Sequence, residues 1–142
     1  MRNLARLMAL GLLLSASASR ADILPRPDRG PSYGSAAGLE FSVNWVKVPF
    51  PPRHPRYFKR AQAAILASCD DPSPNCRLAR SRGVIGMEVL SVNGQDLRPE
   101  NGLVLQILNA FAQRAPGSRV TLEFIAPGSR GEPIKVEFNK DR

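Results

Sequence analysis

Two segments near the end of the chain alternate apolar with polar side chains, and this period of two is typical of β-strands that bury one face. The apolar members are Val120, Leu122 and Phe124 in the first segment and Ile134, Val136 and Phe138 in the second. A loop rich in Gly and Pro, residues 126–133, separates the two segments. The sequence therefore predicts an antiparallel pair of strands over 120–124 and 134–138.

The segment before this pair has the repeat of an amphipathic helix. Between residues 99 and 113, apolar side chains recur at the i, i+3, i+4 spacing: Leu103, Val104, Ile107, Leu108 and Phe111. Asn101 or Asp96 is available as the N-cap, and Ala-Pro-Gly at 115–117 ends the helix. A second helix is predicted over 56–68, where the composition is rich in alanine.

Further strands are predicted earlier in the chain. Residues 39–48 alternate and contain β-branched and aromatic side chains, and a cluster of prolines ends this strand. Residues 84–92 are predicted as a strand that enters a tight turn at Asn93-Gly94, because Asn and Gly tolerate the positive φ angles of such turns. Residues 95–97 would form a brief return strand. Strands and helices mixed in this way indicate an α+β fold.

The beginning of the chain, residues 1–21, has the three parts of a secretory signal peptide. Arg2 and Arg6 precede a short apolar run, 7–14, and small residues follow it, with cleavage expected after Ala18 or Ala21. A membrane anchor is the alternative, but the run is shorter than the roughly 18–20 residues that span a bilayer. The protein is therefore expected to be exported, either to the periplasm or out of the cell, with no membrane span in its mature part.

Removal of the signal leaves 121 residues, a length that fits one domain. Residues 22–37 are rich in Pro, Gly, Ser and charge and lack apolar periodicity, so a flexible, unpacked leader is expected there. The domain is expected over 38–142. Because the signal contains three basic residues and no acidic one, the net charge falls from +8 to +5.

Cys69 and Cys76 are the only two cysteines of the chain. An exported protein enters a compartment where thiols are oxidised, so these two are expected to form one disulfide that pins a turn. A metal site is not predicted, because zinc requires four ligands and the single histidine, His54, is distant in sequence from the cysteines. The same lack of imidazoles argues against a catalytic triad, so no enzymatic role is expected.

The order of these elements, together with three motifs, resembles that of a PDZ domain. IGMEVLSVNGQDL at 85–97 resembles the family's Gly-Asp-x-Ile-Leu-x-Val-Asn-Gly segment, and ILNAFAQRAPGSRVTLEF at 107–124 resembles its second helix and the Pro-Gly-x-x-Val-x-Leu that follows. GLEFSV at 38–43 resembles the carboxylate-binding loop and the strand after it. The final strand is similar to the bacterial, permuted type, which is found attached to envelope proteases and secretion components.

The resemblance implies a small, partly open β-barrel or sandwich of about five to six strands with two helices. It also implies that an extended peptide, or a protein C-terminus, binds by strand addition beside Phe41–Val43 and against the 99–113 helix, without a cofactor. The peptide-binding residues would be Gly38, Leu39, Glu40, Phe41, Val43, Val104, Ile107 and Phe111. The apolar members of this set would suit a hydrophobic core equally well, since apolar helix faces usually pack inward.

A basic surface is the second candidate for function. It would attract anionic components of the cell envelope, such as lipid head groups or acidic proteins, whereas export argues against nucleic acid. Its residues are Arg53, Arg56, Lys59, Arg60, Arg77, Arg80 and Arg82. A solvated surface without a partner is the simpler interpretation of such charge. Glu88, Glu123 and Glu137 are likewise expected to face solvent, because they fall on the polar positions of predicted strands.

Overall fold

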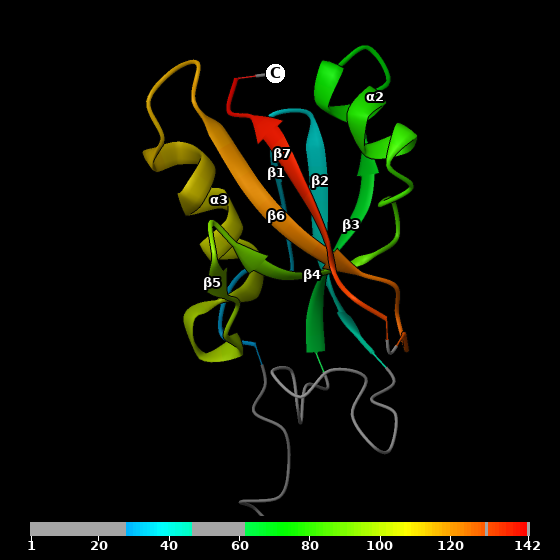
Figure 1. Cartoon of the computed structure of the whole chain (residues 1–142). Coiled ribbons are helices and arrows are strands. Elements are labelled where there is room, and N and C mark those ends of the chain that lie inside the picture. The colour runs from blue at the N-terminus through cyan, green and yellow to red at the C-terminus, as the bar shows by residue number, and fades with distance from the viewer. Residues whose placement is uncertain (1–27, 47–61, 130, 142) are drawn as a thin grey trace, which may run out of the picture.

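The computed structural model describes residues 28–46, 62–129 and 131–141. Over these residues the fold is α+β, with a seven-stranded antiparallel sheet that is not closed and with two α-helices (Figure 1). The strands are β1 (Tyr33–Ala36), β2 (Leu39–Trp45), β3 (Gln62–Cys69), β4 (Glu88–Val92), β5 (Gln95–Asp96), β6 (Arg119–Ile125) and β7 (Ile134–Asn139). The helices are α2 (Pro74–Ser81) and α3 (Leu103–Gln113), and a 3-10 turn covers Pro99–Asn101.

The sheet runs in the order β1-β2-β3-β4-β6-β7, and β5 pairs only with β4. It therefore has one or two strands more than the sequence indicated. The two helices lie at different parts of the curved sheet, as Figure 1 shows: α3 packs beside β1 and β2, and α2 packs beside β7. The main core lies between the sheet and α3 and contains side chains from β2, β3, β4, β6, β7 and both helices.

The predicted pairing of the last two strands is confirmed. β6 and β7 are antiparallel, with Val120 opposite Phe138 and Leu122 opposite Val136. All four of these side chains are buried, and Phe124 and Phe138 meet edge to face with their ring centroids 6.2 Å apart. Strict alternation located these strands because one face of each packs on the core.

The polar positions of the central strands are less exposed than the alternation predicted. Glu137 is exposed as expected, but Glu88 and Glu123 are buried, with 0% and 7% of their surface accessible. Leu90 and Ile125 occupy the same face as these two glutamates and form a second, small apolar cluster. This face of β4 and β6 is therefore partly buried. The prediction that Glu88 and Glu123 face solvent was wrong.

The β4–β5 hairpin and the long helix agree with the sequence. Asn93 and Gly94 form the turn with φ angles of 50° and 81°, the left-handed region that Asn and Gly tolerate. β4 begins at Glu88 rather than at residue 84, because residues 84–87 form a turn. The predicted helix is α3, preceded by the short 3-10 turn, and it buries its apolar face in the core.

The prediction of a helix over 56–68 was wrong where the structure can test it. Residues 62–68 belong to β3, which lies between β2 and β4, and residues 56–61 lie outside the described residues. Four consecutive residues, Ala63–Leu66, are buried, so neither face of this strand shows the polar alternation that identifies a strand. The helix preference of alanine amounts to only a few tenths of a kcal/mol per residue, so burial between two strands overrides it.

The prediction of an unpacked leader over residues 22–37 was also wrong for its last residues. Residues 33–36 form β1, an edge strand that joins β2 through a tight turn at Ala37-Gly38. Both turn residues have positive φ, 52° and 80°. The packed part of the chain therefore begins before Gly38. The predicted signal peptide lies outside the described residues.

Candidate functional site

β2 is paired along both of its edges. On one side it pairs with β3 over its whole length, from Leu39 opposite Cys69 to Trp45 opposite Gln62. On the other side it pairs with β1, with Tyr33 opposite Ser42 and Gly34 opposite Phe41. The Phe41–Val43 segment, beside which a peptide was expected, thus already has a neighbour: the chain's own β1. We call the place that β1 occupies, alongside β2 and against α3, the β1 position.

β1 lies so close to α3 that a side chain on its facing residue, Gly34, would meet side chains of the helix. A Cβ atom on Gly34 would lie 2.5 Å from Cδ1 of Leu108 and 3.0 Å from Cγ1 of Val104, both on α3. A Cβ atom on Gly30 would lie 2.6 Å from the Cα of Gly102, just before the helix. At Gly30 the neighbour is backbone, which cannot move aside, so packing requires a glycine there. At Gly34 a side chain would force the side chain of Leu108 to shift, so glycine is the residue that fits without rearrangement.

Asp28 fastens the segment before β1 to the start of α3. The backbone N–H of Leu103, the first residue of α3, donates to Oδ1 of Asp28 at 2.7 Å. The residue that precedes the helix, Gly102, has no side chain that could cap it. A carboxylate at this end also suits the helix dipole. The caps suggested by the sequence, Asn101 and Asp96, are therefore replaced by a residue 75 positions away.

Three further backbone contacts hold the same segment. The Asp28 N–H donates to Oε1 of Gln62 at 2.6 Å, and the Arg29 N–H donates to the carbonyl of Pro99 at 2.9 Å. The Val43 N–H of β2 donates to the carbonyl of Ser32 at 2.8 Å. In these three bonds the segment itself contributes only main-chain atoms, so they depend little on its sequence, in contrast to the bond of the Asp28 side chain.

Most of the apolar residues expected to bind a peptide form the interior of the fold. Leu39, Phe41, Val104, Ile107 and Phe111 are all buried members of the main core, and Val43 is partly buried against it. Phe41 and Val104 come from β2 and α3, the two elements that flank β1. The structure thus brings the predicted residues together, but as buried members of the main core.

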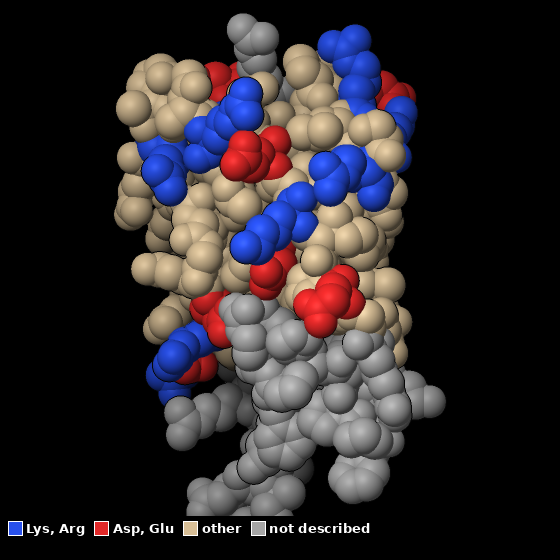
Figure 2. All heavy atoms as spheres, in the orientation of Figure 1, with Lys and Arg blue, Asp and Glu red and all other residues tan. Residues whose placement is uncertain are grey.

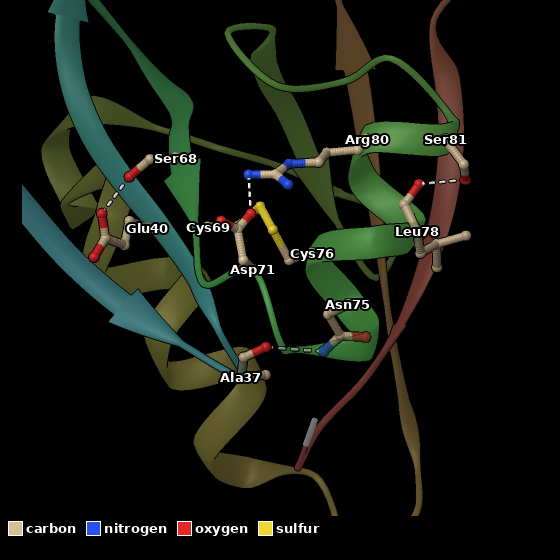
Figure 3. The surroundings of a disulfide bond; sticks show 10 residues. All are labelled: Ala37, Glu40, Ser68, Cys69, Asp71, Asn75, Cys76, Leu78, Arg80 and Ser81. Atoms are coloured by element: carbon tan, nitrogen blue, oxygen red, sulfur yellow. Dashed lines mark hydrogen bonds and ion pairs between the residues drawn. A yellow bond between two sulfur atoms is a disulfide. The ribbon is translucent and has the colours of Figure 1, made fainter.

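The predicted carboxylate-binding loop is a hairpin turn in this structure. Gly38 is the second residue of the β1–β2 turn, and its carbonyl accepts a hydrogen bond from the Asp70 N–H at 2.9 Å. The Glu40 carboxylate accepts a hydrogen bond from the Ser68 hydroxyl on the neighbouring strand (Figure 3). Its partner Ser68 is exposed, so Glu40 faces away from the core.

The predicted disulfide is present. Cys69 and Cys76 are bonded, with their Cα atoms 5.3 Å apart, and they tie the end of β3 to the short helix α2 (Figure 3). Cys76 is fully buried and Cys69 packs against the main core. The disulfide was expected to pin a turn, and the structure shows that the helix α2 begins within this segment, at Pro74.

Asn75, a residue that the sequence did not single out, joins the first and last strands. Its Nδ2 donates to the carbonyl of Ala37 in the β1–β2 turn at 3.0 Å and to the carbonyl of Asn139 at 2.7 Å. Its Oδ1 accepts from the Asn139 N–H at 3.0 Å. The side chain is 1% exposed. Because Asn139 ends β7, this one residue connects the two edges of the open sheet; Figure 3 shows its bond to Ala37.

Basic residues do not form one continuous patch on the face that Figure 2 shows. Arg77, Arg80 and Arg82 are exposed on and after α2, where Arg80 pairs with Asp71. On the face drawn in Figure 2, acidic side chains lie between the basic ones. The remaining predicted members, Arg53, Arg56, Lys59 and Arg60, lie outside the described residues, as does His54.

Two open hollows lie away from the β1 position. One, of about 580 Å³, lies between α3 and the β4–β5 turn, and its lining includes the amide side chains of Asn93, Gln95 and Gln106. The other, of about 520 Å³, lies between α2 and the outer face of β6 and β7, where Arg82 and Lys135 line it. Within the described ranges, no group of three or more His, Cys, Asp and Glu side chains could hold a metal ion.

Comparisons with family models, with curated proteins and with solved structures gave no match. Within the described part of the chain, no helix is long and apolar enough to cross a membrane.

Proposed function

We propose that the protein is an exported, non-catalytic peptide-binding module of the PDZ type, and that it binds an extended segment by strand addition between β2 and α3. The observation that supports this proposal is that β1, an extended strand, already pairs with β2 at this place and packs on α3. The β2 edge and the helix thus have the spacing that an added strand requires.

The main-chain character of the contacts supports the same function. Binding by strand addition obtains affinity from backbone hydrogen bonds and specificity from the side chains that alternate toward the protein. β1 makes four residue pairs with β2, and the Val43 N–H bonds the segment just before it. A partner in an extended conformation, such as the C-terminal tail of another envelope protein, could make the same pairs.

The disulfide supports export, because stable disulfides occur mainly in oxidising compartments such as the periplasm or the extracellular space. The basic-surface function has less support in the described residues, since Arg80 and Arg119 are paired with Asp71 and Glu137. Exposed pairs of this kind leave less unbalanced charge for an anionic partner.

Backbone methylation of a ligand tests the proposed mode of binding. A screen of extended and C-terminal peptides against the purified protein first identifies a ligand. Two versions of that ligand are then made, with N-methyl groups on alternate residues in complementary sets. Only one set of amides points at β2 in an added strand, so methylating that set should weaken binding by about tenfold to thirtyfold if two bonds of roughly 1 kcal/mol are lost.

The complementary set is the matched control, because its N–H groups point away from the protein and its methylation should change the affinity little. Equal losses for both sets would contradict strand addition. Added salt separates the two candidate functions: binding through backbone pairing should change little, whereas binding to an anionic surface should weaken steeply.

A further inference from the structure

We infer that residues 28–36 are an exchangeable internal ligand, which an external segment displaces only if it has glycine at the place of Gly34 and a small side chain two residues later. This inference rests on the proposed function and adds to it the class of peptide that the site accepts. It also assigns the segment an autoinhibitory role, because a site that is filled in cis is closed to a ligand in trans.

The side chains of the segment show which ligands fit. Successive side chains of a strand point to opposite faces, so Gly34 and Ala36 face the core side while Tyr33 and Ser35 face outward. Ala36 packs against the main core, whereas Tyr33 remains 57% exposed and Ser35 is exposed. With the side chains of Leu108 and Val104 close to where a Cβ of Gly34 would be, a ligand with a larger residue opposite Phe41 would have to displace these side chains, at a cost that a glycine avoids.

The contacts of residues 28–36 are also weak enough for this segment to detach. β1 is four residues long and buries no large apolar side chain, whereas its neighbour β2 makes seven residue pairs with β3. Short edge strands without a buried apolar face are held weakly and exchange readily. The anchor at Asp28 is polar and lies near the surface, so its bonds can be replaced by water when the segment detaches.

A permanent structural strand would be expected to bring apolar side chains into the contact with α3. At this contact the chain instead has glycine at both close approaches, Gly30 and Gly34. A glycine contributes only its backbone to this contact. Any extended peptide can supply the same backbone pairing.

The test uses the whole protein with one substitution in β1. Gly34→Val places a branched side chain against Leu108 and should expel β1 from its position, which leaves β2 and α3 open. Ser35→Val is the matched control, because it puts the same side chain on the neighbouring residue of the same strand but on its exposed face. The probe is a fluorescent peptide with the sequence of residues 28–38, DRGPSYGSAAG, and its affinity is measured by anisotropy.

The Gly34→Val protein should bind this peptide at least about tenfold more tightly than the wild type, because the apparent affinity scales with the fraction of molecules whose site is open. The Ser35→Val protein should bind like the wild type. A second peptide, with valine in place of its glycine at position 34, should bind none of the three proteins. Hydrogen exchange should show faster exchange of the β1 amides in the Gly34→Val protein alone.

Asp28→Ala provides a second way to open the site if Gly34→Val does not fold, since it removes an anchor without entering the core. Asp28→Ala should also raise the affinity for DRGPSYGSAAG, by a smaller factor than Gly34→Val does. Equal affinity of the wild type, Asp28→Ala and Gly34→Val proteins would overturn the inference, because β1 would then not compete with ligands.

Two outcomes separate the inference from the proposed function. The opened protein could bind other extended or C-terminal peptides equally well with and without glycine at the place of Gly34. In that case strand addition holds, and the inference about residues 28–36 is wrong. If hydrogen exchange shows that β1 has detached and no peptide binds, the proposed function itself fails. Dimers that form by exchange of β1 between two copies, detected by light scattering, would support an exchangeable strand.

Discussion

Replacing Asp28 by alanine should destabilise the fold by an amount that the contacts at the start of α3 determine. The Asp28 carboxylate accepts from the Leu103 N–H at 2.7 Å and, at 3.3 Å, from the Gly30 N–H. Loss of a side-chain cap costs about 1 kcal/mol, and loss of a negative charge at a helix N-terminus costs about 0.3–1 kcal/mol. Because the two effects overlap, the free energy of unfolding should fall by about 1–2 kcal/mol.

Urea unfolding followed by circular dichroism measures this change. The midpoint should shift to lower urea while the slope m stays constant, since the substitution removes an anchor and leaves the core intact. Asp28→Asn is the control: asparagine keeps the oxygen acceptor and lacks the charge, so it should retain most of the stability. A loss for Asp28→Ala below about 0.5 kcal/mol, the usual range for a surface substitution, would refute the assignment of Asp28 as the anchor of α3.

Three more predictions concern the contacts that close the fold. Asn75→Ala should cost about 2–3 kcal/mol in urea unfolding, because it leaves the buried backbone groups at the β1–β2 turn and at the end of β7 without their partner; a cost below about 1 kcal/mol would contradict the bridging role. Reduction of the Cys69–Cys76 bond, or its replacement by two serines, should lower stability by about 2–3 kcal/mol according to the chain-entropy estimate for so short a loop; unchanged unfolding with and without reductant would show that the bond contributes nothing. Partial desolvation, followed by a hydrogen bond with Glu40 and the charge of Glu40, raises the pKa of the Tyr33 phenol. Its contribution to stability is therefore complete below the ordinary tyrosine pKa of about 10 and is lost as the pH rises through the higher folded value; an NMR titration of the tyrosine rings that places Tyr33 at or below the ordinary value would contradict this.

Elements with a strict period were predictable from the sequence. The β6–β7 pair, the β4–β5 turn at Asn93-Gly94 and the helix α3 all follow from local patterns, and each lies where those patterns placed it. Their signals are local because one face of each strand or helix packs on the core and turn residues have distinctive φ preferences. The disulfide followed from the combination of a signal-like segment with a closely spaced pair of cysteines.

The elements that were predicted wrongly depend on partners far away in the sequence. β3 was taken for a helix because a fully buried strand lacks the polar alternation of a surface strand and its alanines favour helices. β1 was taken for an unpacked leader because a strand that packs through Gly34 and Ala36 has no apolar pattern at all. The cap from Asp28 joins residues 75 positions apart, which no local motif encodes.

The candidate site illustrates the same limit. Sequence motifs selected β2 and the long helix as the two sides of the site, and the structure places residues from both next to each other in the core. The residues that hold β1 against α3 were not selected, since Gly34 and Asp28 stand in a stretch of polar and small residues. Glycines within a segment of otherwise featureless composition are the only signal that could have drawn attention to it.

Locating a bound peptide by NMR tests strand addition beside β2 directly. Intermolecular NOEs would be measured between an unlabelled peptide and the isotope-labelled Gly34→Val protein, whose site is expected to be open. NOEs are expected from consecutive peptide residues to the backbone amides of Phe41–Val43 in antiparallel order, and from one small residue of the peptide to the methyl groups of Leu108. A peptide whose NOEs map only to other surfaces, such as the hollow beside α2, while the β2 amides remain free of contacts, would contradict strand addition.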